Sequence, residues 1–162
     1  MIDVVNLQRK IKLDLAPIRA FVAELSASVE ESANATFTVA FIGDSRMKQL
    51  NELFRNKPTT TDVLSFPHEP DEFNSASSPP YEGGVDAASA DGVVLSTAIF
   101  LGDIVISAEQ AAKQAAENGL SLDAEIKQLI LHGLLHLCGH DHETDNGEMN
   151  TRELQLREQL KI

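Results

Sequence analysis

The sequence predicts a single domain, residues 1–162, built from a small mixed β-sheet covered by helices. Two features of the pattern lead to this fold class. Strand-like and helix-like segments alternate through the first two thirds of the chain, and consecutive helices follow. Residues 129–137 are apolar nearly all round apart from two histidines, so the helix that contains them is expected to be buried in the middle of the domain.

Before residue 67, apolar and β-branched spacing predicts three strands and two helices. The strands are expected at 2–6, 36–42 and 62–66, and the helices at 13–31 and 44–55. Pro17 lies near the start of the first helix, where proline is tolerated. The second helix is expected to take Asp44 as its N-cap and to be followed by a loop at 57–61. Its apolar positions are expected to face inward: Met47, Leu50, Leu53 and Phe54.

After residue 67 the expected order is an insert, one or two strands and three helices. Residues 68–92 are acidic and rich in Ser, Ala, Pro and Gly, which predicts a disordered or flexible insert. Residues 93–106 are β-branched, with an interruption at 102–103, so a second strand is expected at 103–106. Ser107 and Ser121 are expected to cap helices that run to about Asn118 and Cys138, with Gly119 ending the first of them. A last helix is expected at 148–160.

Composition limits the classes of protein that fit. No apolar run approaches the length of a membrane span, and the N-terminus does not resemble a signal peptide. With one cysteine, no intramolecular disulfide can form, so we expect a cytoplasmic protein. The net charge of −12 argues against nucleic acid, but half of it lies in residues 69–92. Four residues could form a local basic surface that makes weak phosphate contacts, although composition alone favours solvated charges on helix faces: Arg46, Lys48, Arg55 and Lys57.

Four of the five histidines lie within residues 132–142. His132 and His136 are four apart, so on a helix they project from the same face. Gly139 is expected to end the helix through a positive φ and to bring His142 back towards them. Three imidazoles with a fourth position left for water are typical of catalytic zinc. His140 would be the third ligand instead if the helix ran past Gly139, and buried core histidines remain the alternative to a metal site.

The spacing of the histidines is that of the metzincin proteases, with their general-base glutamate replaced by Gly133. The pattern therefore predicts a metal site without the peptidase base, and so a metal-assisted hydrolase of another kind. A metal-binding histidine usually donates a hydrogen bond from its second ring nitrogen to a carboxylate or carbonyl group. Asp103 and Asp141 are candidates for this orienting role, and the alternative is that both are ordinary turn residues. Cys138 and Met149 are expected to be core residues.

Four stretches in order carry a resemblance to a known family. They are Leu-Asn-Glu-Leu-Phe-Arg at 50–55, Thr-Asp-Val-Leu-Ser-Phe-Pro at 61–67, Leu-Gly-Asp-Ile-Val-Ile-Ser at 101–107, and the histidine run at 132–142. Together they resemble the YbeY-type endoribonucleases, the bacterial rRNA maturation factors. The resemblance covers residues 34–142 apart from the acidic insert, which is longer than expected for that family. Position 140 is histidine where the family is expected to have tyrosine or histidine.

The resemblance implies an α+β fold with a small, mostly parallel sheet around a central metal-bearing helix. It implies a zinc-dependent endoribonuclease that prefers single strands, matures the 3′ end of 16S rRNA and serves ribosome quality control. It places one Zn²⁺ on His132, His136 and His142 and a catalytic role on Arg55. Without the resemblance, Arg55 would be a surface arginine at a helix end. Single-stranded rRNA and the small ribosomal subunit are the implied partners.

Two other functional classes remain open at this point. A zinc peptidase-like hydrolase would need a base other than Gly133, and a non-catalytic ribosome assembly factor would need only a structural zinc. Imidazole ligands also suit nickel, iron or manganese. The sequence decides neither the oligomeric state nor whether water or the 2′-OH attacks the phosphodiester.

Overall fold

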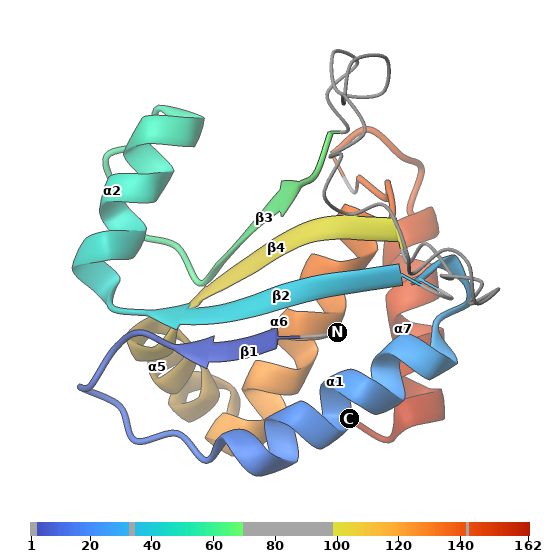
Figure 1. The fold of residues 1–162 in the computed structure, drawn as a ribbon, viewed down its shortest axis with the longest axis horizontal. Coiled ribbons are helices and arrows are strands. Elements are labelled where there is room, and N and C mark those ends of the chain that lie inside the picture. The colour runs from blue at the N-terminus through green and yellow to red at the C-terminus, as the bar shows by residue number, and fades with distance from the viewer. Residues whose placement is uncertain (1–2, 33–34, 70–98, 142) are drawn as a thin grey trace, which may run out of the picture.

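A computed structural model describes residues 3–32, 35–69, 99–141 and 143–162 (Figure 1). Most of the predicted acidic insert, residues 93–98 of the predicted strand region and His142 lie outside the described residues. The described part is a four-stranded sheet with helices packed on it, which confirms the α+β prediction. None of the helices in these ranges is long and apolar enough to cross a bilayer.

The sheet is mixed and mostly parallel, with the strand order β1-β2-β4-β3. Its strands are β1 (Asp3–Asn6), β2 (Ala35–Ile42), β3 (Val63–Pro67) and β4 (Ile99–Ser107). β1, β2 and β4 run parallel, and β3 runs antiparallel to β4. β4 continues as one strand through the expected interruption at 102–103. Gly102 takes a positive φ there and lies close to the carbonyl of Phe66. The β2–β4 register shifts at the same place, between Thr36 and Phe37, as in a β-bulge.

The helices follow the predicted order. They are α1 (Leu15–Ser28), α2 (Asp44–Arg55), α5 (Ala108–Asn118), α6 (Leu122–Leu137) and α7 (Glu148–Leu160), with a 3₁₀ turn η1 (Glu30–Ser32) after α1. The side chains of Ser107 and Ser121 accept hydrogen bonds from the backbone N–H groups of Gln110 and Ala124, in the first turns of α5 and α6. The two serines therefore cap these helices as predicted. Gly119 ends α5 with φ 66°, also as predicted.

α6 is the central helix, with Leu131, Leu134 and Leu135 fully buried. It packs on β3 and β4 and is flanked by α1, α5 and α7. Gly133 faces the sheet so closely that an added Cβ would lie 2.8 Å from Cγ2 of Ile104. The Gly133 carbonyl also accepts a hydrogen bond of 3.1 Å from Oγ of Ser65 on β3. Glycine at this position therefore has a packing reason: it lets α6 seat directly on the sheet.

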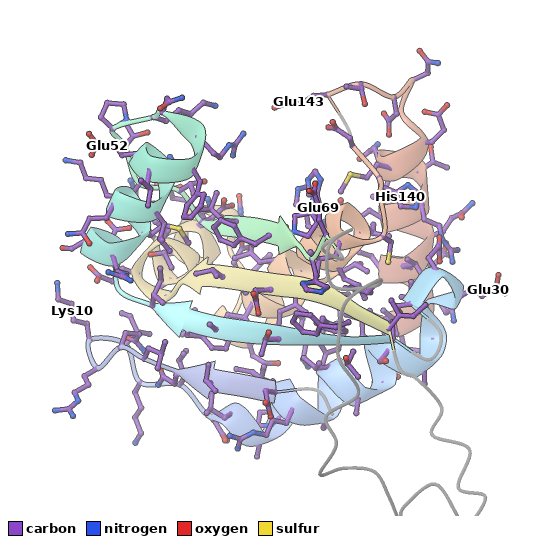
Figure 2. All side chains as sticks on the ribbon, turned by 45° about the horizontal axis from the view of Figure 1, so that its top comes forward. Lys10, Glu30, Glu52, Glu69, His140 and Glu143 are labelled. Atoms are coloured by element: carbon purple, nitrogen blue, oxygen red, sulfur yellow. The ribbon has the colours of Figure 1, made fainter. Side chains whose placement is uncertain are left out.

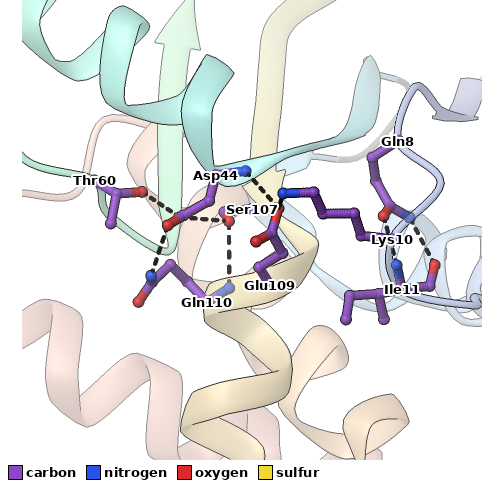
Figure 3. A network of polar contacts seen from close by, with 8 residues as sticks. All are labelled: Gln8, Lys10, Ile11, Asp44, Thr60, Ser107, Glu109 and Gln110. Atoms are coloured by element: carbon purple, nitrogen blue, oxygen red, sulfur yellow. Dashed lines mark hydrogen bonds and ion pairs between the residues drawn. The ribbon is translucent and has the colours of Figure 1, made fainter.

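The prediction that Asp44 is the N-cap of α2 was wrong. The N-cap is Gly43, and Asp44 is the first helical residue. Its backbone N–H donates to Oε1 of Glu109 at 3.1 Å, while its carboxylate accepts from Ser107 and two other side chains, Thr60 and Gln110 (Figure 3). A carboxylate in the first turn can reach a neighbouring helix, so this network ties the start of α2 to the start of α5.

The prediction that Leu53 and Phe54 face inward was also wrong. α2 packs through a small cluster on Met47, and its last turn extends beyond that cluster, so Leu53 is 72% and Phe54 60% exposed. The Phe54 ring meets the Phe66 ring edge to face, at 5.1 Å between centroids. Helical spacing identifies an apolar face but does not tell how far the partner surface extends along it. The C-terminal end of α2, with Arg55, therefore projects past β3.

Candidate active site

A cavity of about 780 Å³ opens above β3, between α2, α6 and α7. It is lined by the histidines of α6, by the last residue of α2, by the loop after α6 and by charged or amide side chains of several helices. These polar lining residues include Arg55, Gln114, Asn118, Glu125, Gln128, His132, His136, His140, Asp141, Glu143, Glu153 and Arg157. Figure 2 shows His140 and Glu143 on the α7 side of this face and Glu52, on α2, across from them.

His132 and His136 lie one turn apart on α6, and their rings meet edge to face with centroids 4.7 Å apart. Their Nε2 atoms are 3.2 Å apart. Two nitrogens on one tetrahedral Zn²⁺, each at about 2.0–2.1 Å, would lie about 3.3 Å apart. The pair therefore fits two corners of a zinc site.

The chain turns where the sequence predicted. α6 ends at Leu137, and Gly139 has φ 97°. The condition for His140 as third ligand, a helix continuing past Gly139, is not met. Nε2 of His140 instead lies 3.6 Å from Oε1 of Glu31. Each carboxylate oxygen of Glu31 also accepts one hydrogen bond of 2.9 Å from Arg152. These contacts hold the turn against η1 and α7.

The favoured third ligand, His142, lies outside the described residues. Within 3–32, 35–69, 99–141 and 143–162, no three His, Cys, Asp or Glu side chains are close enough to hold a metal ion. The structure therefore brings together two of the three predicted ligands, and His142 stays a prediction.

The partner of His132 is a residue that the sequence analysis missed. Oε2 of Glu153, on α7, lies 3.1 Å from Nδ1 of His132, and Oε1 accepts a hydrogen bond of 2.5 Å from Nη2 of Arg157. Burial opposes the charge of Glu153, but the contacts with His132 and Arg157 outweigh it and lower its pKa. An ionised Glu153 selects the tautomer of His132 with a proton on Nδ1, which leaves the Nε2 lone pair for the cavity.

The two predicted orienting carboxylates, Asp103 and Asp141, are engaged by other groups. Asp103 accepts a hydrogen bond from Thr38 of the neighbouring strand, and Asp141 accepts from the backbone N–H of Glu143 in the loop. A signal for Glu153 was available. It occupies the buried face of α7 between Met149 and Leu156, where a glutamate is unusual unless it is paired.

Arg55, to which the resemblance gives a catalytic role, lines the cavity. It is the last residue of α2, with its side chain 42% exposed and Nη2 4.0 Å from Oε1 of Glu143. The other three residues of the expected basic surface, Arg46, Lys48 and Lys57, do not line this cavity. Arg55 is thus the member of that group with access to a ligand bound near the histidines.

Cys138 and Met149 are core residues, as predicted. Met149 is buried, and Cys138 packs partly buried against the main core. Burial, aided by the negative charge of Glu31, raises the pKa of Cys138 to about 11. The thiol is therefore protonated at neutral pH and is not arranged as a nucleophile or a metal ligand.

Comparison with known proteins shows which family this chain resembles. The family profile described as endoribonuclease YbeY matches residues 3–161. An endoribonuclease YbeY of Nautilia profundicola is 43% identical over 119 residues, which are 74% of this chain and 68% of that protein. Another, of Carboxydothermus hydrogenoformans, is 32% identical over 94% of this chain and 91% of its own length.

The fold has a counterpart among solved structures. The solution structure of TM1509 from Thermotoga maritima superposes with a TM-score of 0.58 at 22% identity, over 99% of this chain and 89% of that one. That likeness concerns the fold, whereas the profile and the curated relatives concern the family. On these matches, the chain belongs to the endoribonuclease YbeY family.

Proposed function

We propose that this protein is a zinc-dependent endoribonuclease that cuts single-stranded RNA, matures the 3′ end of 16S rRNA and takes part in ribosome quality control. The observation that carries the proposal is the convergence of two imidazole Nε2 atoms, 3.2 Å apart, in a cavity that Arg55 also lines. The names of the curated relatives support the reaction class. We further propose a cytoplasmic location, with single-stranded rRNA and the small ribosomal subunit as partners.

His132, His136 and His142 would hold one Zn²⁺. When bound, zinc supplies Lewis-acid activation of a phosphoryl oxygen and a bound water with a pKa near ~7. Glu153 fixes the ring of His132 through Nδ1, so that Nε2 points towards that position. The turn at Gly139, held by the Glu31 contacts of His140, brings the chain back towards α6.

Arg55 would bind the phosphodiester across the cavity from the histidines. Its planar guanidinium can donate two parallel hydrogen bonds to phosphate oxygens and stabilise the charge that develops during phosphoryl transfer. Its long contact with the exposed Glu143, at 4.0 Å, is weak enough for a phosphate to replace. The attacking group is either water or the 2′-OH of the substrate.

The architecture also weighs against the peptidase alternative. At position 133, where metzincins carry their general base, a side chain would collide with Ile104. Glu153, the buried carboxylate beside His132, already contacts His132 and Arg157. Neither position 133 nor Glu153 is therefore arranged to supply the general base of a peptidase.

The test is cleavage of an end-labelled single-stranded RNA carrying the 16S 3′ end, with zinc content measured for each variant. Wild type should cut. Arg55→Ala should bind zinc and lose at least tenfold in cleavage, since a charge-assisted phosphate contact is removed. His136→Ala should lose both zinc and cleavage.

Lys57→Ala is the matched control, because it removes a positive charge two residues from Arg55 that does not line the cavity. It should cut like wild type. If zinc-loaded wild type does not cut any RNA but supports subunit assembly in extracts, the protein is an assembly factor and the proposal is wrong. If it cuts peptides instead, the peptidase alternative is correct.

A further inference from the structure

One buried acid in the cavity has no role in the proposed chemistry. Glu125, near the start of α6, is 5% exposed and lines the same cavity as the histidines. Its Oε2 has no hydrogen-bond partner among the described residues. A buried carboxylate without a partner is unfavourable, and such groups in native proteins usually meet a ligand, water or ion. Glu125 is therefore available to a donor that enters the cavity.

Glu125 lies too far from the histidine pair to act as a metal ligand or a general base there. It precedes His132 by seven residues, two helical turns, so the two Cα atoms are about 10 Å apart along the same face of α6. What it contacts must lie beside the reacting phosphate, at about the reach of a neighbouring nucleotide.

The lining around Glu125 suits the edge of a base rather than a phosphate. Gln128 is on the same helix, and Gln114 and Asn118 lie on the last turns of α5, which ends just before α6 begins. Amides offer both donors and acceptors without charge. An ionised carboxylate at Glu125 would repel a phosphate, and it can accept hydrogen bonds but cannot donate them.

We propose that this end of the cavity is a nucleobase subsite in which Glu125 accepts a hydrogen bond from the exocyclic amine of a base flanking the scissile phosphate. Cytosine N4 is a donor of this kind, and carboxylates pair with it in base recognition. Uracil is the isosteric counterpart but places the carbonyl oxygen O4 at the same point, which the carboxylate repels. The inference rests on the proposed ribonuclease function and adds a base preference to it.

The test uses single-stranded oligoribonucleotides with one cleavage site that differ only by C or U at one flanking position, each position being varied in turn. Wild type should cleave the C substrate with a kcat/KM roughly tenfold or more above that of the U substrate at one of these positions. Glu125→Gln keeps the shape but presents an amide that can donate to O4. It should abolish or invert the C/U preference while the zinc content stays that of wild type.

Glu117→Gln is the matched control, because Glu117 is exposed on α5 and does not line the cavity. It should retain the wild-type preference, which separates base recognition from a general change of charge. A purely structural role for Glu125 would lower stability and rate for both substrates alike. If Glu125→Gln does not fold, Glu125→Asp, which withdraws the carboxylate by one methylene, should narrow the C/U ratio.

The outcomes separate the two proposals. Cleavage by wild type with equal kcat/KM for C and U at every flanking position, or an unchanged ratio in Glu125→Gln, overturns the base subsite and leaves the ribonuclease function standing. No cleavage of any RNA by zinc-loaded wild type overturns both.

Discussion

Oε2 of Glu153 lies 3.1 Å from Nδ1 of His132, so a carboxylate on α7 orients the ring of a histidine on α6. The two residues are 21 positions apart, and only the packing of α7 against α6 brings them together. The same carboxylate is held from its other oxygen by Arg157. Arg157, Glu153 and His132 thus form a connected row of side chains that all line the cavity, and its members can be tested one at a time.

Glu153→Gln should weaken zinc binding by 10- to 100-fold, the usual cost of losing the carboxylate behind a ligand histidine. The neutral amide no longer favours the tautomer with a proton on Nδ1, which is the tautomer that leaves the Nε2 lone pair for the metal. Competition with a chromophoric chelator measures the affinity directly. Glu158→Gln, on the exposed side of the same helix, should bind zinc like wild type, and equal affinities in the two variants would refute the positioning role.

Gly133→Ala should destabilise the protein by about 1–3 kcal/mol, because the new methyl group overlaps the side chain of Ile104 in a packed core. Helix propensity alone predicts the opposite sign, since alanine is favoured over glycine in a helix. The measurement is urea unfolding of both proteins. The same substitution in an Ile104→Ala background should cost less, and additive costs would argue against the contact as the cause.

The ion pair of Glu31 and Arg152 predicts a specific acid sensitivity. The two hydrogen bonds from Arg152, against an opposing effect of burial, lower the pKa of Glu31 from 4.5 to about 2. A pKa that is lower in the folded state stabilises the protein above pH 4.5, and this stabilisation is lost as the pH falls from 4.5 to about 2.

Glu31→Gln should therefore reduce the stability measured near pH 6 and flatten its decline over that acidic range. Denaturant unfolding of wild type and variant at a series of pH values checks this. Parallel curves for the two proteins between pH 5 and the acid limit would show that another group causes the decline.

Cys138 should react slowly with iodoacetamide at neutral pH, because burial and the nearby charge of Glu31 raise its pKa to about 11 and the thiolate is the reactive form. Mass spectrometry of the folded protein over time gives the rate, and the chain unfolded in urea serves as the reference. Equal rates in the two states at pH 7.5 would contradict the raised pKa.

Most secondary structure could be predicted because its signals are local. Ser107 and Ser121 cap helices within three residues of themselves, and Gly119 and Gly139 turn the chain where a positive φ is needed. The spacing of His132 and His136 likewise requires only a helix to bring the two rings together. Nothing in these assignments depends on the rest of the chain.

The failures share the opposite property. Asp44 was expected to cap its own helix, but its carboxylate is engaged by side chains of the loop and of α5. Phe54 has the right spacing to be buried, but α2 extends beyond the surface that would cover it. Asp103 was a candidate to orient a histidine, but it accepts a hydrogen bond from Thr38, and the carboxylate beside His132 is Glu153. Glu153 could not be identified without the position of α7.

The sequence by itself therefore determined the order of elements, the N-caps of α5 and α6, the histidine pair and the family. Tertiary structure alone decided which acids face the cavity, because a carboxylate's partner depends on which elements pack together and not on its neighbours in the chain. It placed Glu153 beside His132 and left Oε2 of Glu125 without a hydrogen-bond partner in the described ranges. It also explains Gly133, because α6 approaches Ile104 too closely for a side chain at that position.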